Sequence, residues 1–377
     1  MAQIEVAAYY FPSWHRDPRN DKWHGEGWTE WDLVQAARPR FPGHRQPITP
    51  AWGYANESDP KVMAKEIDLA ASHGITAFLF DYYHYDDGQF LAGALDRGFL
   101  GAPNNDRLKF ALMWANHDWK NIFPAKLGIP AQMLAPGKVT KAGFERICDH
   151  IIARYFAHPS YLRINGCPYF SIFDLATFVE SCGGLDGARA AIETLQFKIA
   201  CANLPGVHLN AMVWLFSHAP RWAAWGGVEK VVATLGIDSV AAYNWYDHYD
   251  LAKDTFPRGS YQKAALANFA AWEEQTKKWP IPYIPNVTMG WDSSPRCCGT
   301  DKYEMRGYPW LPILDGNTPS AFRNALEHAK AFLAKHPHGL QMLTLNAWNE
   351  WTEGAYLLPD TEHGTAYLEV IKRTFTR

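Results

Sequence analysis

Two glutamates three residues apart, Glu350 and Glu353, form the strongest chemical pattern in this sequence. They follow an apolar run at residues 342–345 that predicts a buried strand, and Trp348 and Trp351 stand beside them. Breaking or forming a glycosidic bond requires two carboxyl groups close together, in environments that separate their pKa values. We therefore predict that both glutamates are catalytic. The alternative interpretation is a pair of solvated glutamates at an ordinary strand end.

Aromatic side chains are numerous enough to suggest a use besides packing. The chain contains 17 Trp, 18 Tyr and 20 Phe among 377 residues, and a buried Trp or Tyr must also place a polar N–H or O–H group. Many of these rings stand next to Asp, Glu, His or Asn. Rings that stack on sugar faces, beside groups that hydrogen-bond hydroxyls, indicate a carbohydrate partner. The alternative is a large aromatic core.

Strand-like and helix-like segments alternate along the chain. The predicted strands cover residues 4–11, 75–80, 108–113, 169–173, 209–216, 239–243, 283–289 and 342–345. The predicted helices cover residues 60–73, 90–99, 141–156, 185–202, 261–278, 319–335 and 364–375, and a connector at 220–235 has room for a short helix. Apolar strands joined by helices predict an α/β fold, a (β/α)8 TIM barrel, as a single domain over residues 1–377 with extended loops.

Polar and aromatic residues gather directly after the predicted strands. In a (β/α)8 barrel this face carries the active site. The predicted substrate-binding residues are Trp14, His15, Asp81, Trp114, His117, Asp118, Asp174, Trp245, Trp291, Asp292, Asn349 and Trp351. For each ring the alternative is a place in the core, and for each aspartate it is a cap on the next turn. Glu26 and Glu30, in the long first loop, either line the site or are solvated.

The motifs of other protein classes are missing. An open doubly wound sheet, the alternative fold, normally carries a glycine-rich phosphate loop, and the sequence has neither G-x-G-x-x-G nor G-x-x-x-x-G-K-[ST]. A net charge of −3 without a basic run argues against nucleic-acid binding. Neither an Asp-x-Asp pair nor metal-ligand spacing is present. We therefore expect no metal and no other cofactor.

Targeting signals and cysteines bear on location. The first residues lead straight into a strand-like segment, without a basic stretch followed by an apolar run. No segment approaches the roughly 20 apolar residues of a membrane span. The 6 cysteines are scattered and do not resemble a disulfide framework. These features predict a cytoplasmic protein, or a periplasmic one if a signal has been removed.

Three stretches resemble the WbsX-type proteins, which are similar to glycoside hydrolase family 99. They are the aromatic segments at 9–15 and 23–31, the segment A-P-N-N-D-R at 102–107, and W-N-E-W-T-E-G at 348–354. The resemblance covers nearly the whole chain and implies a (β/α)8 barrel. It also implies kinship with retaining, endo-acting enzymes on α-mannosides, in which an N-E-W-x-E-G motif supplies both catalytic carboxylates.

The resemblance also implies a role for each glutamate. Glu350 corresponds to the base that activates the sugar's own 2-hydroxyl, which attacks the anomeric carbon to give a 1,2-anhydro sugar. Glu353 corresponds to the acid that protonates the leaving oxygen and then activates water. The WbsX name implies a glycosyltransferase of surface-polysaccharide (lipopolysaccharide O-antigen) biosynthesis, so this activity remains the alternative. A carbohydrate-binding barrel without activity is a third possibility, against which the presence of both glutamates argues.

Overall fold

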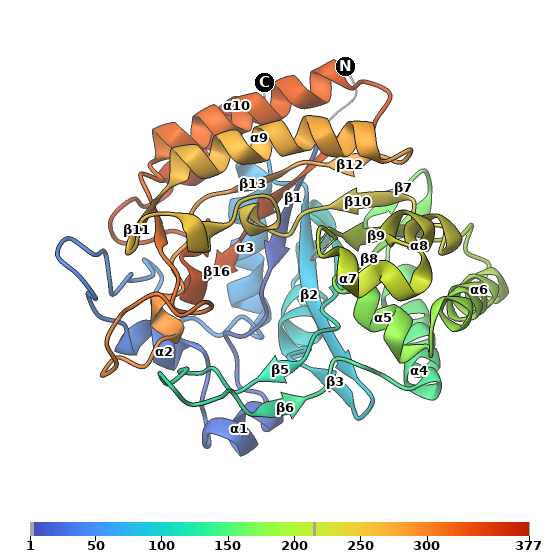
Figure 1. The fold of residues 1–377 in the computed structure, drawn as a ribbon, viewed down its shortest axis with the longest axis horizontal. Coiled ribbons are helices and arrows are strands. Elements are labelled where there is room, and N and C mark those ends of the chain that lie inside the picture. Colours follow the sequence, from blue (N-terminus) through green and yellow to red (C-terminus); the bar gives the residue numbers. More distant parts are fainter. Residues whose placement is uncertain (1–3, 214–215, 377) are drawn as a thin grey trace.

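The computed structural model describes residues 4–213 and 216–376, and its main sheet is a parallel barrel (Figure 1). The barrel strands are β1 (Glu5–Tyr10), β2 (Ala77–Tyr85), β4 (Lys109–Trp114), β8 (Cys167–Ile172), β9 (His208–Met212), β10 (Ser239–Ala241), β12 (Tyr283–Ile284), β13 (Asn286–Thr288) and β15 (Met342–Asn346). They pair in the order β12-β10-β9-β8-β4-β2-β1-β15-β13. The predicted (β/α)8 barrel is confirmed.

The predicted seventh strand is interrupted at Pro285. Its first part, β12, pairs with β10, and its second part, β13, pairs with β15. Proline has no N–H to give to a neighbouring strand, but the Pro285 carbonyl still accepts a hydrogen bond from the Thr344 N–H at 3.0 Å. The two short strands together bring the sheet nearly to closure between the sixth and eighth strand positions.

Helices cover the outside of the barrel, and capping side chains mark where several of them begin. The outer helices are α3 (Pro60–Ser72), α4 (Lys141–Ile151), α5 (Leu175–Ser181), α6 (Leu185–Cys201), α7 (Ala219–Trp222), α8 (Val228–Thr234), α9 (Tyr261–Lys278), α10 (Pro319–Lys335) and α11 (Ala366–Phe375). Asp59, Thr140, Ser260 and Thr318 each accept a hydrogen bond from a first-turn N–H, which satisfies a donor that the helix itself leaves free. In Figure 1, α9 and α10 lie side by side along one edge of the barrel.

The helix predicted at residues 90–99 is wrong in its first half. β3 (Gly88–Phe90) pairs antiparallel with the extended end of β2. The two turn residues are Asp86 and Asp87, and Gly88, the first residue of β3, pairs with Tyr85 and has a φ of 116°, a conformation that favours glycine. Only Ala94–Phe99 are helical, as a π-helical turn. Residues 214–215, near the end of the predicted fifth strand, lie outside the described residues.

Loops after the strands build the face that carries the site. The first loop holds α1 (Pro18–His24) and α2 (Trp31–Ala36), and the hairpin of β5 (Trp119–Lys120) and β6 (Met133–Ala135) follows β4. The remaining short strands are β7 (Arg163–Ile164), β11 (Arg258–Ser260), β14 (Ile313–Asp315), β16 (Asn349–Glu350) and β17 (Ala355–Tyr356). In Figure 1, α1, β5 and β6 lie around the C-terminal end of β2. Among the described residues, no helix is long and apolar enough to cross a membrane.

Candidate active site

An open cleft of about 1180 Å³ lies at the C-terminal ends of the barrel strands. Its wall includes Asp81 from β2, Tyr243 from the segment after β10, Arg296 from the loop after β13, and both Glu350 and Glu353. The volume exceeds the upper end of ordinary small-molecule pockets, about 1000 Å³. The cleft therefore has room for more than one sugar ring.

Local geometry turns Glu350 and Glu353 to the same side. Successive side chains on an extended strand point to opposite faces, so in β16 Glu350 faces the cleft and Asn349 faces away from it. The next residues, Trp351–Glu353, form a 3₁₀ helix, in which side chains three apart lie one above the other. The three-residue spacing of the motif is therefore the spacing that places both carboxyl groups in one cleft, where both residues are buried.

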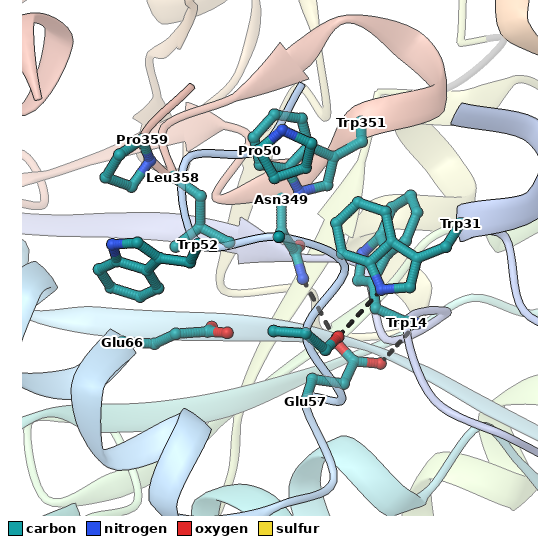
Figure 2. Close-up of a pocket in the computed structure, with 12 residues that line it drawn as sticks. Trp14, Trp31, Pro50, Trp52, Glu57, Glu66, Asn349, Trp351, Leu358 and Pro359 are labelled. Carbon is teal, nitrogen blue, oxygen red and sulfur yellow. Dashed lines mark hydrogen bonds between the residues drawn. The ribbon is translucent and has the colours of Figure 1, made fainter. Parts of the chain in front are cut away.

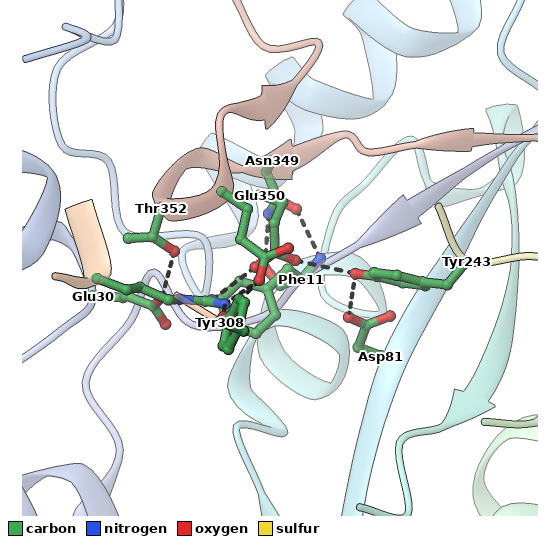
Figure 3. Close-up of polar contacts among 10 residues, drawn as sticks. Phe11, Glu30, Asp81, Tyr243, Tyr308, Asn349, Glu350 and Thr352 are labelled. Carbon is green, nitrogen blue, oxygen red and sulfur yellow. Dashed lines mark hydrogen bonds and ion pairs between the residues drawn. The ribbon is translucent and has the colours of Figure 1, made fainter. Parts of the chain in front are cut away.

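A single buried guanidinium contacts three carboxyl groups of the cluster, two of which, Glu30 and Glu350, are labelled in Figure 3. Arg296 Nη2 lies 2.8 Å from Glu350 Oε1 and 2.7 Å from Glu30 Oε1, and Nη1 contacts Glu353 Oε1. Arg296 Nε donates to Glu30 Oε1 at 2.9 Å, and the Thr352 hydroxyl donates to the same oxygen. One positive charge thus contacts three carboxyl groups, and all three are buried.

Two tyrosine hydroxyls complete the hydrogen bonding of the pair. Tyr308 donates to Glu353 Oε1 at 2.7 Å. The Tyr243 hydroxyl lies 3.1 Å from Glu350 Oε2 and 3.0 Å from Asp81 Oδ2. Hydrogen bonds to an ionised group are stronger than those between neutral groups, so each glutamate has a partner that favours its carboxylate form.

Burial, with a smaller effect of neighbouring carboxylates, raises the pKa values of the two glutamates. Burial raises the pKa of Glu350 well above its ordinary value, and the charge of Glu353 adds to this effect while Arg296 opposes it. Burial also raises the pKa of Glu353, against the lowering effects of Arg296 and of the Tyr308 hydrogen bond. Like charges this close do not both ionise readily. The pair is suited to hold one proton, which is the state that acid–base catalysis needs.

Five of the predicted substrate-binding residues line this cleft, namely Asp81, His117, Asp118, Asp174 and Trp291. Burial lowers the pKa of His117, so its ring is neutral near pH 7. Asp174 caps α5 through the Thr177 N–H at 3.0 Å and accepts from Arg221 Nη2 at 2.8 Å. Capping and cleft lining, which the sequence presents as alternatives, both hold for Asp174.

The other seven predicted residues do not line the cleft. Trp114 packs against Phe144 and Phe178, and Trp245 packs against Tyr261 and Phe269, so both rings point outward to the helices. Figure 2 shows a separate small pocket, whose lining includes Trp14, Asn349 and Trp351. The buried ring of His15 lies beside it, 2.8 Å from Glu57 Oε1. Strand alternation explains why Asn349, next to Glu350, faces the other way.

Asp292, the seventh, joins two loops instead of facing the cleft. Its Oδ2 lies 2.8 Å from His44 Nε2 and 2.8 Å from Gln46 Nε2, both in the first loop. Burial alone would raise the pKa of Asp292, but these partners hold it below its ordinary value. Asp292 therefore ties the loop that carries Arg296 to the loop that carries Glu30.

Several residues of the cluster were not predicted. Arg296, Tyr243 and Tyr308 carry no motif, although Tyr243 ends the predicted sixth strand, a position that could have marked it. Of the two first-loop glutamates left open, Glu30 belongs to the cluster, while Glu26 is exposed and pairs with Arg16. Within residues 4–213 and 216–376, no group of three or more His, Cys, Asp or Glu side chains is placed to hold a metal ion.

The chain is thus a (β/α)8 barrel with a buried acid cluster at the C-terminal ends of its strands. The chain belongs to the family described as "Glycosyltransferase WbsX", whose model matches residues 6–371. A curated relative described as "Uncharacterized protein WxcX", from Xanthomonas campestris pv. campestris (strain B100), is 26% identical over 382 residues. The match covers 99% of this chain and 50% of WxcX, so the chain spans about half the length of this relative.

Solved structures with a similar fold include a glycoside hydrolase and a glycoside hydrolase-like protein. The GH99 endo-alpha-mannosidase from Bacteroides thetaiotaomicron has a TM-score of 0.55 at 14% identity, covering 99% of this chain and 96% of that chain. A structure described as "Glycoside hydrolase-like protein" has a TM-score of 0.61 at 15% identity, covering 100% of this chain and 95% of that chain. At these identities the likeness establishes the fold.

Proposed function

We propose that this protein hydrolyses α-mannoside-like bonds in a poly- or oligosaccharide, with retention of the anomeric configuration. The observation that carries the proposal is the shared cleft of Glu350 and Glu353, two buried carboxyl groups that contact one guanidinium. Most enzymes that cleave glycosidic bonds use a pair of carboxyl groups, and the active site of a (β/α)8 barrel lies at its C-terminal face. The fold likeness to an endo-alpha-mannosidase supports the mannoside-like substrate.

In the first step the substrate supplies its own nucleophile. Ionised Glu350 takes the proton of the 2-hydroxyl, and the 2-oxygen forms a bond to the anomeric carbon. The bond from that carbon to the leaving oxygen breaks, and protonated Glu353 gives its proton to the leaving oxygen. The products are the released chain end and a 1,2-anhydro sugar, with Glu350 now protonated and Glu353 ionised.

In the second step the same groups work in reverse. Glu353 takes a proton from water, the water oxygen bonds to the anomeric carbon, and the bond from that carbon to the 2-oxygen breaks. Glu350 returns its proton to the 2-oxygen, so that both residues regain their starting states. Two inversions at one carbon give net retention. Each glutamate acts once as acid and once as base.

Cleft residues beyond the acid pair are suited to further sugar rings. We assign substrate contact to His117, Asp118, Asp174 and Trp291, whose positions in the cleft support this role. Trp291 packs at 4.3 Å between ring centroids against Tyr246, and both rings line the cleft. Carboxylates accept hydrogen bonds from hydroxyls, and a neutral imidazole both accepts from and donates to them. An aromatic face covers the apolar side of a sugar.

The test is turnover of an α-mannoside oligosaccharide and of the matched substrate that lacks the 2-hydroxyl. The intact substrate should be cleaved in the presence of EDTA, and proton NMR should detect the retained anomer first. The 2-deoxy substrate should not be cleaved, because the internal nucleophile is missing. Equal turnover of both substrates would refute the 2-hydroxyl mechanism.

A glycosyltransferase is the second candidate, favoured by the description of the family. It would use the same cleft with a nucleotide sugar as donor and a growing polysaccharide as acceptor. The two functions differ in what is consumed. The transferase would release a nucleotide from a nucleotide sugar, transfer the sugar to an acceptor and cleave no oligosaccharide. That result would favour transfer over the proposed hydrolysis.

A further inference from the structure

Tyr243 stands between two carboxyl groups (Figure 3). Its hydroxyl oxygen lies 3.0 Å from Asp81 Oδ2 and 3.1 Å from Glu350 Oε2. Both distances are within hydrogen-bond range. Asp81 comes from β2, Tyr243 from the segment after β10 and Glu350 from β16, and all three line the cleft.

The Tyr243 hydroxyl has too few hydrogens to donate to both carboxyl groups. A phenol has one hydrogen and donates it to one acceptor. Burial raises the pKa of Tyr243 well above its ordinary value, so the phenol keeps that hydrogen at neutral pH. The second contact then joins two oxygens, and it is a hydrogen bond only if the other carboxyl group supplies a proton. For both contacts to be hydrogen bonds, one of Asp81 and Glu350 must be protonated.

The surroundings of the two carboxyl groups decide which one holds the proton. Glu350 Oε1 accepts from Arg296 Nη2 at 2.8 Å, which favours the ionised form. None of the ion pairs among the described residues includes Asp81, and its buried Oδ1 has no hydrogen-bond partner there. An unpaired carbonyl oxygen costs less to bury than an unpaired carboxylate oxygen.

The pKa values of the two carboxyl groups are displaced in the same direction. Burial raises the pKa of Asp81 well above its ordinary value; the charge of Glu353 adds to this, while Tyr243 and Arg296 oppose it. Burial raises the pKa of Glu350 well above its ordinary value too, so the contacts of the two groups distinguish them. The charge of Asp81 also raises the pKa values of Tyr9 and Tyr83, two phenols that burial keeps neutral.

We propose that Asp81 is a neutral carboxylic acid that donates to Tyr243, and that Tyr243 in turn donates to Glu350. Asp81 is then a positioning residue, because it acts on Glu350 through Tyr243. Its proton fixes the direction of both hydrogen bonds and so holds Glu350 as the ionised base. This role for Glu350 rests on the proposed function, whereas the protonation of Asp81 does not.

Infrared spectroscopy tests the protonation without any substrate. A protonated carboxyl group has a C=O stretch separate from that of a carboxylate. The spectrum of the parent at pH 7, minus that of Asp81→Asn, should contain one protonated-carboxyl band in protein labelled with ¹³C-aspartate. The label moves that band and so assigns it to an aspartate. A difference spectrum that contains only carboxylate bands would overturn the proposal.

Kinetics test the direction of the hydrogen bonds. An Asn amide N–H can donate to Tyr243 as the acid does, whereas Leu cannot. Asp81→Asn should therefore keep more kcat/KM than Asp81→Leu, on the scale of one lost hydrogen bond between neutral groups, about 2- to 10-fold. In Tyr243→Phe, the acidic limb of the pH profile should move to higher pH, because Glu350 has lost a donor.

Equal loss of kcat/KM in Asp81→Asn and Asp81→Leu would mean that the charge of Asp81 is needed, which overturns the proposal. The failure of the proposed function is a different result. If the parent cleaves no glycoside, the infrared measurement still decides whether Asp81 is protonated. If the parent cleaves glycosides and no protonated band is lost, only the inference about Asp81 fails.

Discussion

Glu30 Oε1 accepts hydrogen bonds from both Nε and Nη2 of Arg296, at 2.9 and 2.7 Å. Arg296 is therefore anchored from the first loop while its other contacts reach Glu350 and Glu353. A planar guanidinium with five donors suits this arrangement, and a lysine ammonium does not.

We expect Arg296→Met to lower the free energy of unfolding at pH 7 by about 3–5 kcal/mol, because it leaves several buried carboxyl groups without a cation. The deficit should shrink as the pH falls, since the carboxyl groups then take up protons. Urea unfolding across this pH range measures the effect, with Arg189→Met on the exposed surface of α6 as control. A deficit independent of pH would mean that lost packing, not lost charge, causes it.

Glu350→Gln and Glu353→Gln should each lower kcat by at least about 10²–10⁴-fold, the usual contribution of general acid–base catalysis. Glutamine keeps the shape and one acceptor, so thermal unfolding should change little. The matched control is Glu327→Gln, on the exposed face of α10. Near-normal kcat in either variant, on a substrate that the parent cleaves, would remove that residue from the mechanism.

Glu66 provides a prediction about stability and pH. It is buried, accepts from Trp348 Nε1 at 2.8 Å, and burial raises its pKa to about 8. A carboxyl group whose pKa is higher in the folded state binds protons more tightly there. Its favourable contribution is therefore complete below the unfolded pKa and is lost as the pH rises toward about 8.

Glu66→Gln should accordingly gain stability relative to the parent between pH 5 and pH 8, by up to about 1.4 kcal/mol per pH unit. Chemical unfolding at several pH values measures the gain. Glu193→Gln, on the exposed face of α6, should show no such slope. A constant difference between Glu66→Gln and the parent would contradict the pKa shift.

Substitutions of Trp291 and Trp245 should distinguish a substrate-binding tryptophan from one that packs in the core. Trp291 lines the cleft, whereas Trp245 is buried against α9 and donates from Nε1 to the Asn286 carbonyl at 2.9 Å. Trp291→Ala should raise KM for an oligosaccharide substantially more than it lowers stability. Trp245→Ala should cost about 3–5 kcal/mol of folding free energy, as for other large core rings. A similar loss of stability in both variants, with KM unchanged, would place Trp291 in the core as well.

The sequence predicts the barrel well because each element carries its own local signal. Apolar strands and capped helices repeat along the chain, and the structure has them within a few residues of the predicted bounds. The exception at 90–99 arose because Asp86 and Asp87 turn the chain into a hairpin before Gly88, and the helical spacing downstream concealed this turn.

The site was predictable only where chemistry and spacing coincide in one motif. The Glu350 and Glu353 positions follow from a short segment, but Arg296 meets them through a loop whose path no local pattern encodes. Side-chain direction was the other limit. Trp114 and Asn349 stand at strand ends like true cleft residues, yet alternation along the strand turns them away.

The pairing of β1 with β15 joins residues Glu5–Ala8 to Met342–Leu345. During synthesis the first strand leaves the ribosome long before its partner exists, on the order of tens of seconds earlier at about 5–20 residues per second. Until then β1 has only β2 beside it, and its other edge is open to foreign strands. β15 thus closes the open edge of β1, and the segment directly after it carries Glu350 and Glu353. A nascent chain therefore gains the carboxyl pair and its protection from aggregation at nearly the same time.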